Sequence, residues 1–141
     1  MINAKNSNRG MDALIEGTSM GMQTMVISRH NPAKLPRIEE MPTIKTVWMS
    51  SLGQEGSFEV QDIDHLEGLI ETFFNSTGGV ILLDGLDYLV KNNDFQTALR
   101  MVQNSRDSAL VNAGVLILSL EYGALGSHEI NLLEREADKV L

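Results

Sequence analysis

The sequence contains no cysteine, which excludes disulfides, thiolate catalysis and metal sites held by cysteine. No stretch reaches the roughly 18 consecutive apolar residues that a membrane-spanning helix requires. The polar N-terminal segment, MINAKNSNRG, does not resemble a signal peptide. We therefore expect a soluble, cytoplasmic protein without a membrane partner.

Basic residues are also few, with 11 Lys and Arg against 19 Asp and Glu, for a formal net charge of −8. They are scattered and never form a run, so the positive face that binds a phosphate backbone is not expected, and neither is a nucleic-acid partner. The dipeptide Gly-Lys does not occur. The chain therefore has no nucleotide-hydrolysing phosphate loop, in which that pair grips the phosphates.

What is present is typical of one globular domain. The 141 residues are 43% hydrophobic and 21% charged, which suffices for a sizeable core. We expect a single domain over residues 1–141, with a flexible polar segment at residues 1–9. Four short apolar runs predict strands, at residues 24–28, 46–50, 79–84 and 114–120. The last two runs are continuous rather than alternating, as in strands that are covered on both faces.

Helical spacing of apolar residues predicts helices over residues 62–74 and 94–109. Asp94 is in place to cap the second of these. A final helix can be capped by Ser127, with an inward stripe of Ile130, Leu133, Ala137 and Val140. A less regular pattern predicts another helix near residues 11–20. Helices and strands thus alternate along the chain. This order favours an α/β fold with three layers, in which a mostly parallel sheet has helices on both faces.

Asp84 ends a buried apolar strand in the segment GVILLDGLDYL, residues 79–89. A carboxylate in this position has the form of a Walker B element, which holds magnesium beside a nucleotide. Its necessary companion, the phosphate loop, is missing. An Asp that follows a parallel strand is also a common turn and helix-capping residue, and this structural reading is the simpler one.

The segment ILLDGLDYL, the strand GVLILSL and the helix HEINLLERE resemble the archaeal "domain of unknown function 835" family. MVISRHNP at residues 25–32 and VWMSS at residues 47–51 extend the resemblance over nearly the whole chain. It implies a RecA-like three-layer fold without the phosphate loop, of the kind found at the ends of signalling chains. It implies no catalytic residues. Family members carry a strand before the first helix, and this chain begins too late for a full version. The resemblance therefore predicts a sheet that is one strand short.

Ligands of open parallel sheets bind beyond the carboxyl ends of the strands. The fold places several polar side chains there, together with Ser119, and they form a tentative site for a small anion or for acid–base chemistry: Arg29, His30, Ser50, Ser51, Asp84 and Glu121. The alternative is structural, with Arg29 paired to Asp84 or Glu121 and fixing the ends of the strands. The three histidines, His30, His65 and His128, belong to separate elements and lack metal-ligand spacing. We expect no metal, no cofactor and no catalytic triad.

Four methionines cluster near the N-terminus: Met11, Met20, Met22 and Met25. Flexible thioether side chains suit adaptable interfaces, although they more often fill irregular cores. Beside an uncovered sheet edge they predict self-association as a two-fold dimer.

Three functional hypotheses follow from these features. The first is a non-catalytic protein-interaction or signalling module that holds a partner, or itself, on a sheet edge or a helical face. The second is a regulatory domain that binds a nucleotide or another small anion at the strand ends. The third is an enzyme that uses Asp84 or Glu121 with Arg29.

Overall fold

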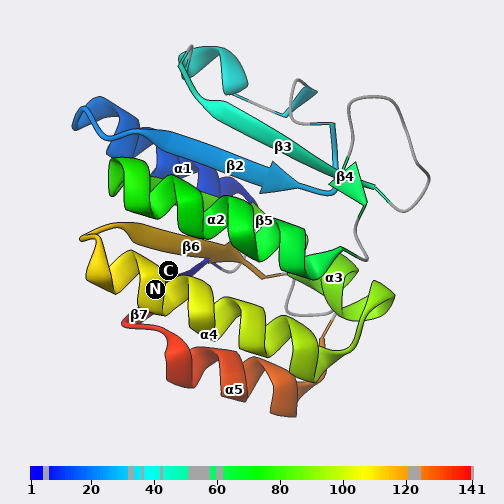
Figure 1. Ribbon diagram of the computed structural model, residues 1–141. Coiled ribbons are helices and arrows are strands. Elements are labelled where there is room, and N and C mark those ends of the chain that lie inside the picture. Colours follow the sequence, from blue (N-terminus) through cyan, green and yellow to red (C-terminus); the bar gives the residue numbers. More distant parts are fainter. Residues whose placement is uncertain are drawn as a thin grey trace.

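The computed structural model describes residues 1–4, 7–31, 34–35, 37–41, 43–50, 58–59, 62–120 and 125–140. In these residues seven strands form one sheet in the order β4-β3-β2-β5-β6-β1-β7, and every neighbouring pair is parallel (Figure 1). The predicted parallel α/β sheet is confirmed. The strands are β1 (Ile2–Ala4), β2 (Thr24–Ser28), β3 (Lys45–Ser50), β4 (Phe58–Glu59), β5 (Val80–Asp84), β6 (Val115–Ser119) and β7 (Lys139–Val140).

The two continuous apolar runs lie in the centre of the sheet as β5 and β6. All five residues of β5 are buried, and so are the last four of β6. Central strands of a three-layer fold have both faces covered, and this is why neither sequence shows an apolar–polar alternation.

The helices are α1 (Ser7–Ser19), α2 (Ile63–Thr77), α3 (Leu86–Asn92), α4 (Phe95–Val111) and α5 (Ser127–Glu136), with a 3₁₀ turn η2 (Ile38–Glu40). Two of the helices, α2 and α4, begin after an aspartate that caps them. The carboxylate of Asp62 accepts a hydrogen bond from the backbone N–H of His65 at 3.2 Å, and that of Asp94 accepts from Thr97 at 2.7 Å. Each carboxylate thereby satisfies one of the free donors at a helix N-terminus.

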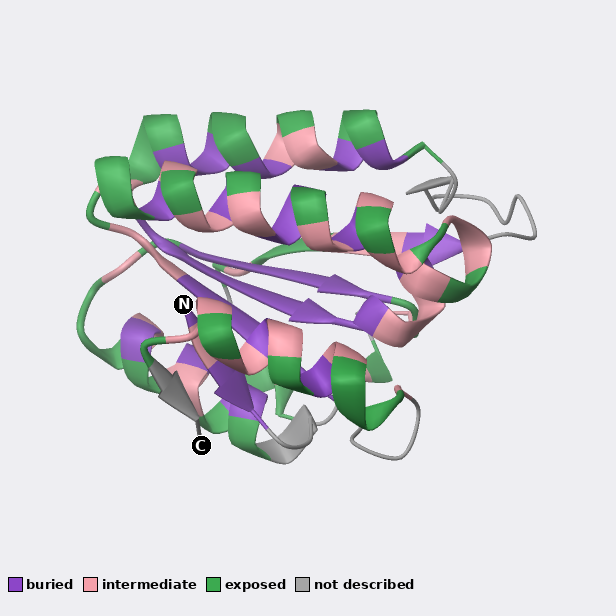
Figure 2. Ribbon diagram, turned by 90° about the horizontal axis from the view of Figure 1, so that it is seen from below, coloured by how far each residue is buried: buried purple, intermediate pink, exposed green. Residues whose placement is uncertain are grey.

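Successive side chains of β5 pack into two separate cores. Ile81 and Leu83 lie with the buried faces of α2, α4 and α5, whereas Val80 and Leu82 lie with Met11 and Leu14 of α1 and with Met41. Helices therefore cover both sides of the sheet, as Figure 2 shows. The three layers expected from the alternating order are confirmed.

The described residues 2–4 and 7–9, within the segment 1–9 that we expected to be flexible, form regular structure. Residues 2–4 form β1, which pairs with β6 and β7, and α1 begins at Ser7. Ala4 is fully buried although the segment as a whole is polar. Three residues are too few to show a periodic pattern, so composition alone misjudges this segment.

A second unexpected element is α3, seven residues that follow Asp84 and Gly85 directly. Its buried residues, Leu86 and Leu89, continue the apolar run of β5, so the sequence pattern does not reveal where the strand ends and the helix begins. In the described part of the chain, no helix is long and apolar enough to cross a membrane.

Candidate functional site

The strand ends meet the condition for a ligand crevice between β2 and β5. The chain leaves β2 toward β3 and leaves β5 toward β6, so the two connections diverge from a neighbouring pair of strands. Ser28 and Asp84, the last residues of these strands, are register partners. Both are buried, and the Ser28 hydroxyl donates to Asp84 Oδ2 at 3.3 Å. The carboxylate of the Walker-B-like motif is thus engaged within the sheet.

Arg29 follows Ser28 and turns toward α3. Its Nη1 lies 3.3 Å from Oδ2 of Asp87, and its guanidinium carbon lies 5.3 Å from the centre of the Tyr88 ring. Trp48 of β3 donates its indole N–H to the Arg29 carbonyl at 3.3 Å. Arg29 therefore forms an ion pair and a cation–π contact with α3. It is held in place, as the structural alternative expects, by Asp87, a partner that this alternative did not name.

Gly85 allows this arrangement because it joins β5 to α3 with φ of 118°. A Cβ at this position would lie 3.3 Å from the Arg29 side chain and 3.4 Å from Met49. Glycine alone tolerates such a φ without strain, so the chain can turn into α3 directly beneath Arg29.

The remaining predicted residues are only partly brought together. His30 is exposed, and its backbone N–H, rather than its ring, donates to the Ser28 hydroxyl at 3.1 Å. Ser50 is buried at the end of β3 and is engaged in a polar interaction. Ser51 and Glu121 lie outside the described residues. Among the described residues, no group of three or more His, Cys, Asp or Glu is placed to hold a metal ion.

Sequence reasoning missed three residues of this cluster, Trp48, Asp87 and Tyr88. Trp48 was placed in a strand but given no role. The other two lie in the segment GVILLDGLDYL, in which the sequence pattern pointed only to Asp84. A helix of seven residues gives no periodic signal, so its inward side chains could not be assigned to the strand ends.

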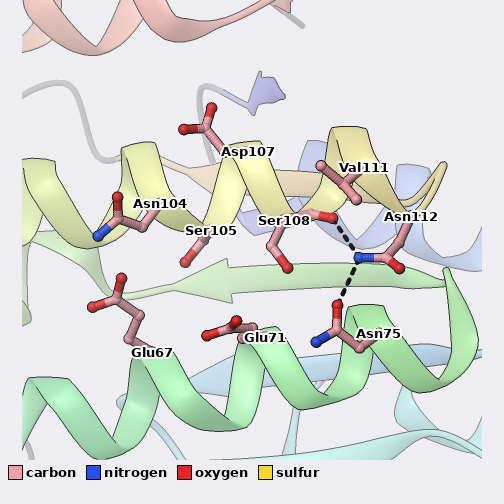
Figure 3. A pocket seen from close by; sticks show the side chains of 9 residues that line it. All are labelled: Glu67, Glu71, Asn75, Asn104, Ser105, Asp107, Ser108, Val111 and Asn112. Atoms are coloured by element: carbon pink, nitrogen blue, oxygen red, sulfur yellow. Dashed lines mark hydrogen bonds between the residues drawn. The ribbon is translucent and has the colours of Figure 1, made fainter.

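A second candidate site lies on the helical face, between α2 and α4. This groove has a volume of about 410 Å³, and nine residues line it: Glu67, Glu71, Asn75, Asn104, Ser105, Asp107, Ser108, Val111 and Asn112. In Figure 3 the side chains of Glu67, Glu71 and Asn75 point from α2 toward α4. Asn104, Ser105 and Ser108 point back toward α2, while Asp107 and Val111 lie on the outer side of α4.

The α2 side of the groove is a stripe of residues one turn apart, at positions 67, 71 and 75. Glu67 and Glu71 have no ion-pair partner in the described residues, and like charges at this spacing destabilise a helix by about 0.2–0.5 kcal/mol. Asp107 differs, because it lies 3.1 Å from Arg106. The groove is therefore acidic chiefly along α2.

A comparison with known protein families identifies the family to which the chain belongs. The family described as protein of unknown function (DUF835) matches residues 3–137. The chain belongs to the DUF835 family. No curated protein matches it. DUF835 membership confirms the resemblance drawn from the ILLDGLDYL, GVLILSL and HEINLLERE segments, and it assigns no role to any residue.

The leading strand of this DUF835 chain corrects one expectation. The resemblance predicted a sheet that lacks a strand at this end, yet β1 pairs with β6 over residues 2–4. A further short strand, β7, pairs with the outer side of β1. The edge that we expected to be uncovered is thus occupied, because three residues before α1 are enough to add a strand.

The methionines are distributed differently from the expected interface. Met25 and Met11 are 0% and 5% exposed and belong to the cores on the two faces of the sheet. Met22 is half-buried, and Met20 is 72% exposed. Buried side chains cannot contact a second copy, so the assignment of Met11 and Met25 to an interface is wrong. Self-association stays a prediction, but the uncovered sheet edge from which it was inferred is occupied by β1 and β7.

Proposed function

We propose that this domain is a non-catalytic protein-interaction module of a signalling system, and that it holds its partner on the helical face formed by α2 and α4. The observation that carries the proposal is the groove between these helices. It is open, it presents two carboxylates without ion-pair partners in the described residues, and it includes an exposed apolar side chain. This side chain is Val111, at the end of α4, which is 84% exposed.

The charged side chains at the strand ends support the same proposal because they already have partners within the domain. The guanidinium of Arg29 is paired with Asp87, and Asp84 accepts from Ser28. An incoming anion would have to displace the half-buried carboxylate of Asp87 and would then approach the buried carboxylate of Asp84. These groups fix β2, β5 and α3 to one another, so the helical face is the better surface for a partner. A cytoplasmic location suits such a module and remains part of the proposal.

Site-specific photo-crosslinking in cells of the source organism tests the proposal. A photoreactive phenylalanine analogue replaces Val111 in one full chain and Glu16 of α1, an exposed residue on the opposite face, in a control chain. We expect one discrete protein adduct from position 111 that is absent from position 16. Equal adducts from both positions, or none from position 111, would refute docking on the α2–α4 face.

A regulatory ligand site at the strand ends is the second candidate, favoured by the divergence of the chain at β2 and β5. A ligand at about a hundredfold its Kd adds about 2.7 kcal/mol of stability, which a thermal-shift assay detects easily. We expect neither ATP nor GTP, with magnesium, to shift the melting temperature or to be hydrolysed. A clear shift that disappears in Asp84→Ala would establish this second function in place of the first.

A further inference from the structure

The groove between α2 and α4 contains a buried polar group with no partner. Ser105 is 3% exposed, and its Oγ makes no hydrogen bond in the described part of the chain. Figure 3 shows the hydroxyl directed from α4 into the groove, toward the side of Glu67 and Glu71. Buried hydroxyls are nearly always hydrogen-bonded, so an unpaired one that faces an open groove points to a donor supplied from outside.

The polar groups around Ser105 indicate that the external hydrogen-bond donor carries a positive charge. Across the groove stand the carboxylates of Glu67 and Glu71, and no Lys, Arg or His is among the described residues that line it. At one end, Asn112 Nδ2 donates to Asn75 Oδ1 at 2.9 Å and to the Ser108 carbonyl at 2.8 Å. These hydrogen bonds join α2 to the end of α4, and they use the amide donor of Asn112, which is therefore not available to a ligand. The groove therefore offers acceptors and negative charge to an occupant that must bring donors and positive charge.

The described carboxylates are not clustered closely enough to hold a metal ion, so the arrangement suits a larger organic cation. A volume of about 410 Å³ is near the lower end of the range for small-ligand pockets and accommodates one or two long side chains. The apolar side chain of Val111 lies at the end of α4 among the residues that line the groove, where the aliphatic stem of a basic side chain would pack.

We propose that the groove receives the ammonium group of a lysine, presented by a basic segment of the partner protein. This inference rests on the proposed function and names the chemistry of the partner. The ammonium has three N–H donors on a flexible stem. The Ser105 hydroxyl accepts one of them at the base of the groove, and Glu67 and Glu71 take the others and neutralise the charge.

Titration of the ¹⁵N-labelled domain with a short oligolysine peptide, followed by NMR, tests the inference. We expect amide shifts along α2 and α4 around the groove. The same peptide acetylated on every lysine should cause none, because acetylation removes the charge. Spermidine should bind more weakly than the peptide. If spermidine binds as tightly as the peptide, the groove takes a free polyamine, and the assignment to a partner protein is wrong.

Two variants locate the binding. Glu67→Gln with Glu71→Gln should weaken oligolysine binding about tenfold, since two exposed ion pairs are lost. Ser105→Ala should weaken it severalfold while the melting temperature stays the same or rises, because an unpaired hydroxyl is removed. The matched control is Glu16→Gln with Glu39→Gln, two exposed residues on the opposite side of the sheet, which changes the net charge equally.

The control variant should bind like the wild type. If it loses as much affinity as the groove variant, the peptide is attracted only by the overall charge and the inference fails. Absence of any oligolysine binding, together with a specific adduct from position 111, would refute the lysine site and leave the docking face standing. Loss of both results would refute both proposals.

Discussion

At the scale of single residues, Asp94 shows how one carboxylate couples helix formation to pH. Its side chain accepts the backbone N–H of Thr97 at 2.7 Å, at the N-terminus of α4. The hydrogen bonds from Thr97 favour the charged form and hold the pKa of Asp94 below its ordinary value of 3.8. A carboxyl group whose pKa is lowered by folding stabilises the folded state above that ordinary value, and the contribution is lost as the pH falls through the lowered pKa.

We therefore expect Asp94→Ala to lower the free energy of unfolding at pH 7. The difference from the wild type should shrink as the pH falls below about 4 and further through the lowered pKa, at which the carboxyl group becomes protonated in the folded state as well. Asp94→Asn keeps an oxygen that can cap the helix and should lose less at pH 7. Denaturant unfolding of each variant across this pH range measures both effects, with Glu39→Ala as an exposed control. An Asp94→Ala deficit that does not change with pH would show that the charge is unimportant.

Arg29 shows which parts of a site sequence reasoning can reach. Its position beyond β2 follows from the apolar run at residues 24–28, and that expectation is confirmed. Its ion-pair partner could not be inferred, because Asp87 lies in a helix too short to produce a pattern. Ser105 was missed for another reason. A serine on a polar stretch of helix gives no signal in sequence, and only the packing of α2 against α4 shows that its hydroxyl is buried and unpaired.

At the scale of elements, two glycines test how tightly α2 is held. A Cβ on Gly114, just before β6, would come within 2.6 Å of the Phe74 ring of α2. A Cβ on Gly68, in the middle of α2, meets nothing within 4 Å. The first glycine is required by a close approach of two elements, whereas the second only lowers helix propensity.

We expect Gly114→Ala to destabilise the domain by about 1–3 kcal/mol, because the Phe74 ring must move. Gly68→Ala should instead stabilise it by up to about 1 kcal/mol, since alanine is the better helix former. Urea unfolding of the two variants gives the comparison directly. A stabilised Gly114→Ala would mean that α2 does not pack against this turn as described.

The elements that sequence reasoning found are those long enough to carry a pattern. Strands β2, β3, β5 and β6 and helices α2, α4 and α5 lie close to their predicted positions, because burial of a face requires a repeat of apolar residues. The predicted stripe of α5 ran too far, since the helix ends at Glu136 and Val140 belongs to β7. The four elements that sequence reasoning did not find, β1, α3, β4 and β7, have two to seven residues each. Their formation depends on neighbouring elements, such as β6 for β1, and not on their own composition.

At the scale of the whole molecule, the two candidate surfaces differ in how their polar groups are used. Around the strand ends, Ser28 binds Asp84 and Arg29 binds Asp87, and these contacts join β2, β5 and α3. Ser119, at the end of β6, also has a buried hydroxyl without a hydrogen bond in the described part of the chain. In the α2–α4 groove two carboxylates and one buried hydroxyl have no partner in the described part of the chain. The surfaces therefore differ in their charged groups, which are paired at the strand ends, whereas the carboxylates of the groove have no ion-pair partner in the described residues and are available to a cationic partner. The central claim is that the helical face is the functional surface.

The most direct test is NMR mapping of the ¹⁵N-labelled full chain as the partner, identified by crosslinking from position 111, is added. We predict that the amide shifts concentrate at residues 67–75 and 104–112, which line the groove, and leave residues 28–30 and 84–88 at the strand ends unchanged. Shifts concentrated at the strand ends, with α2 and α4 unaffected, would contradict the account.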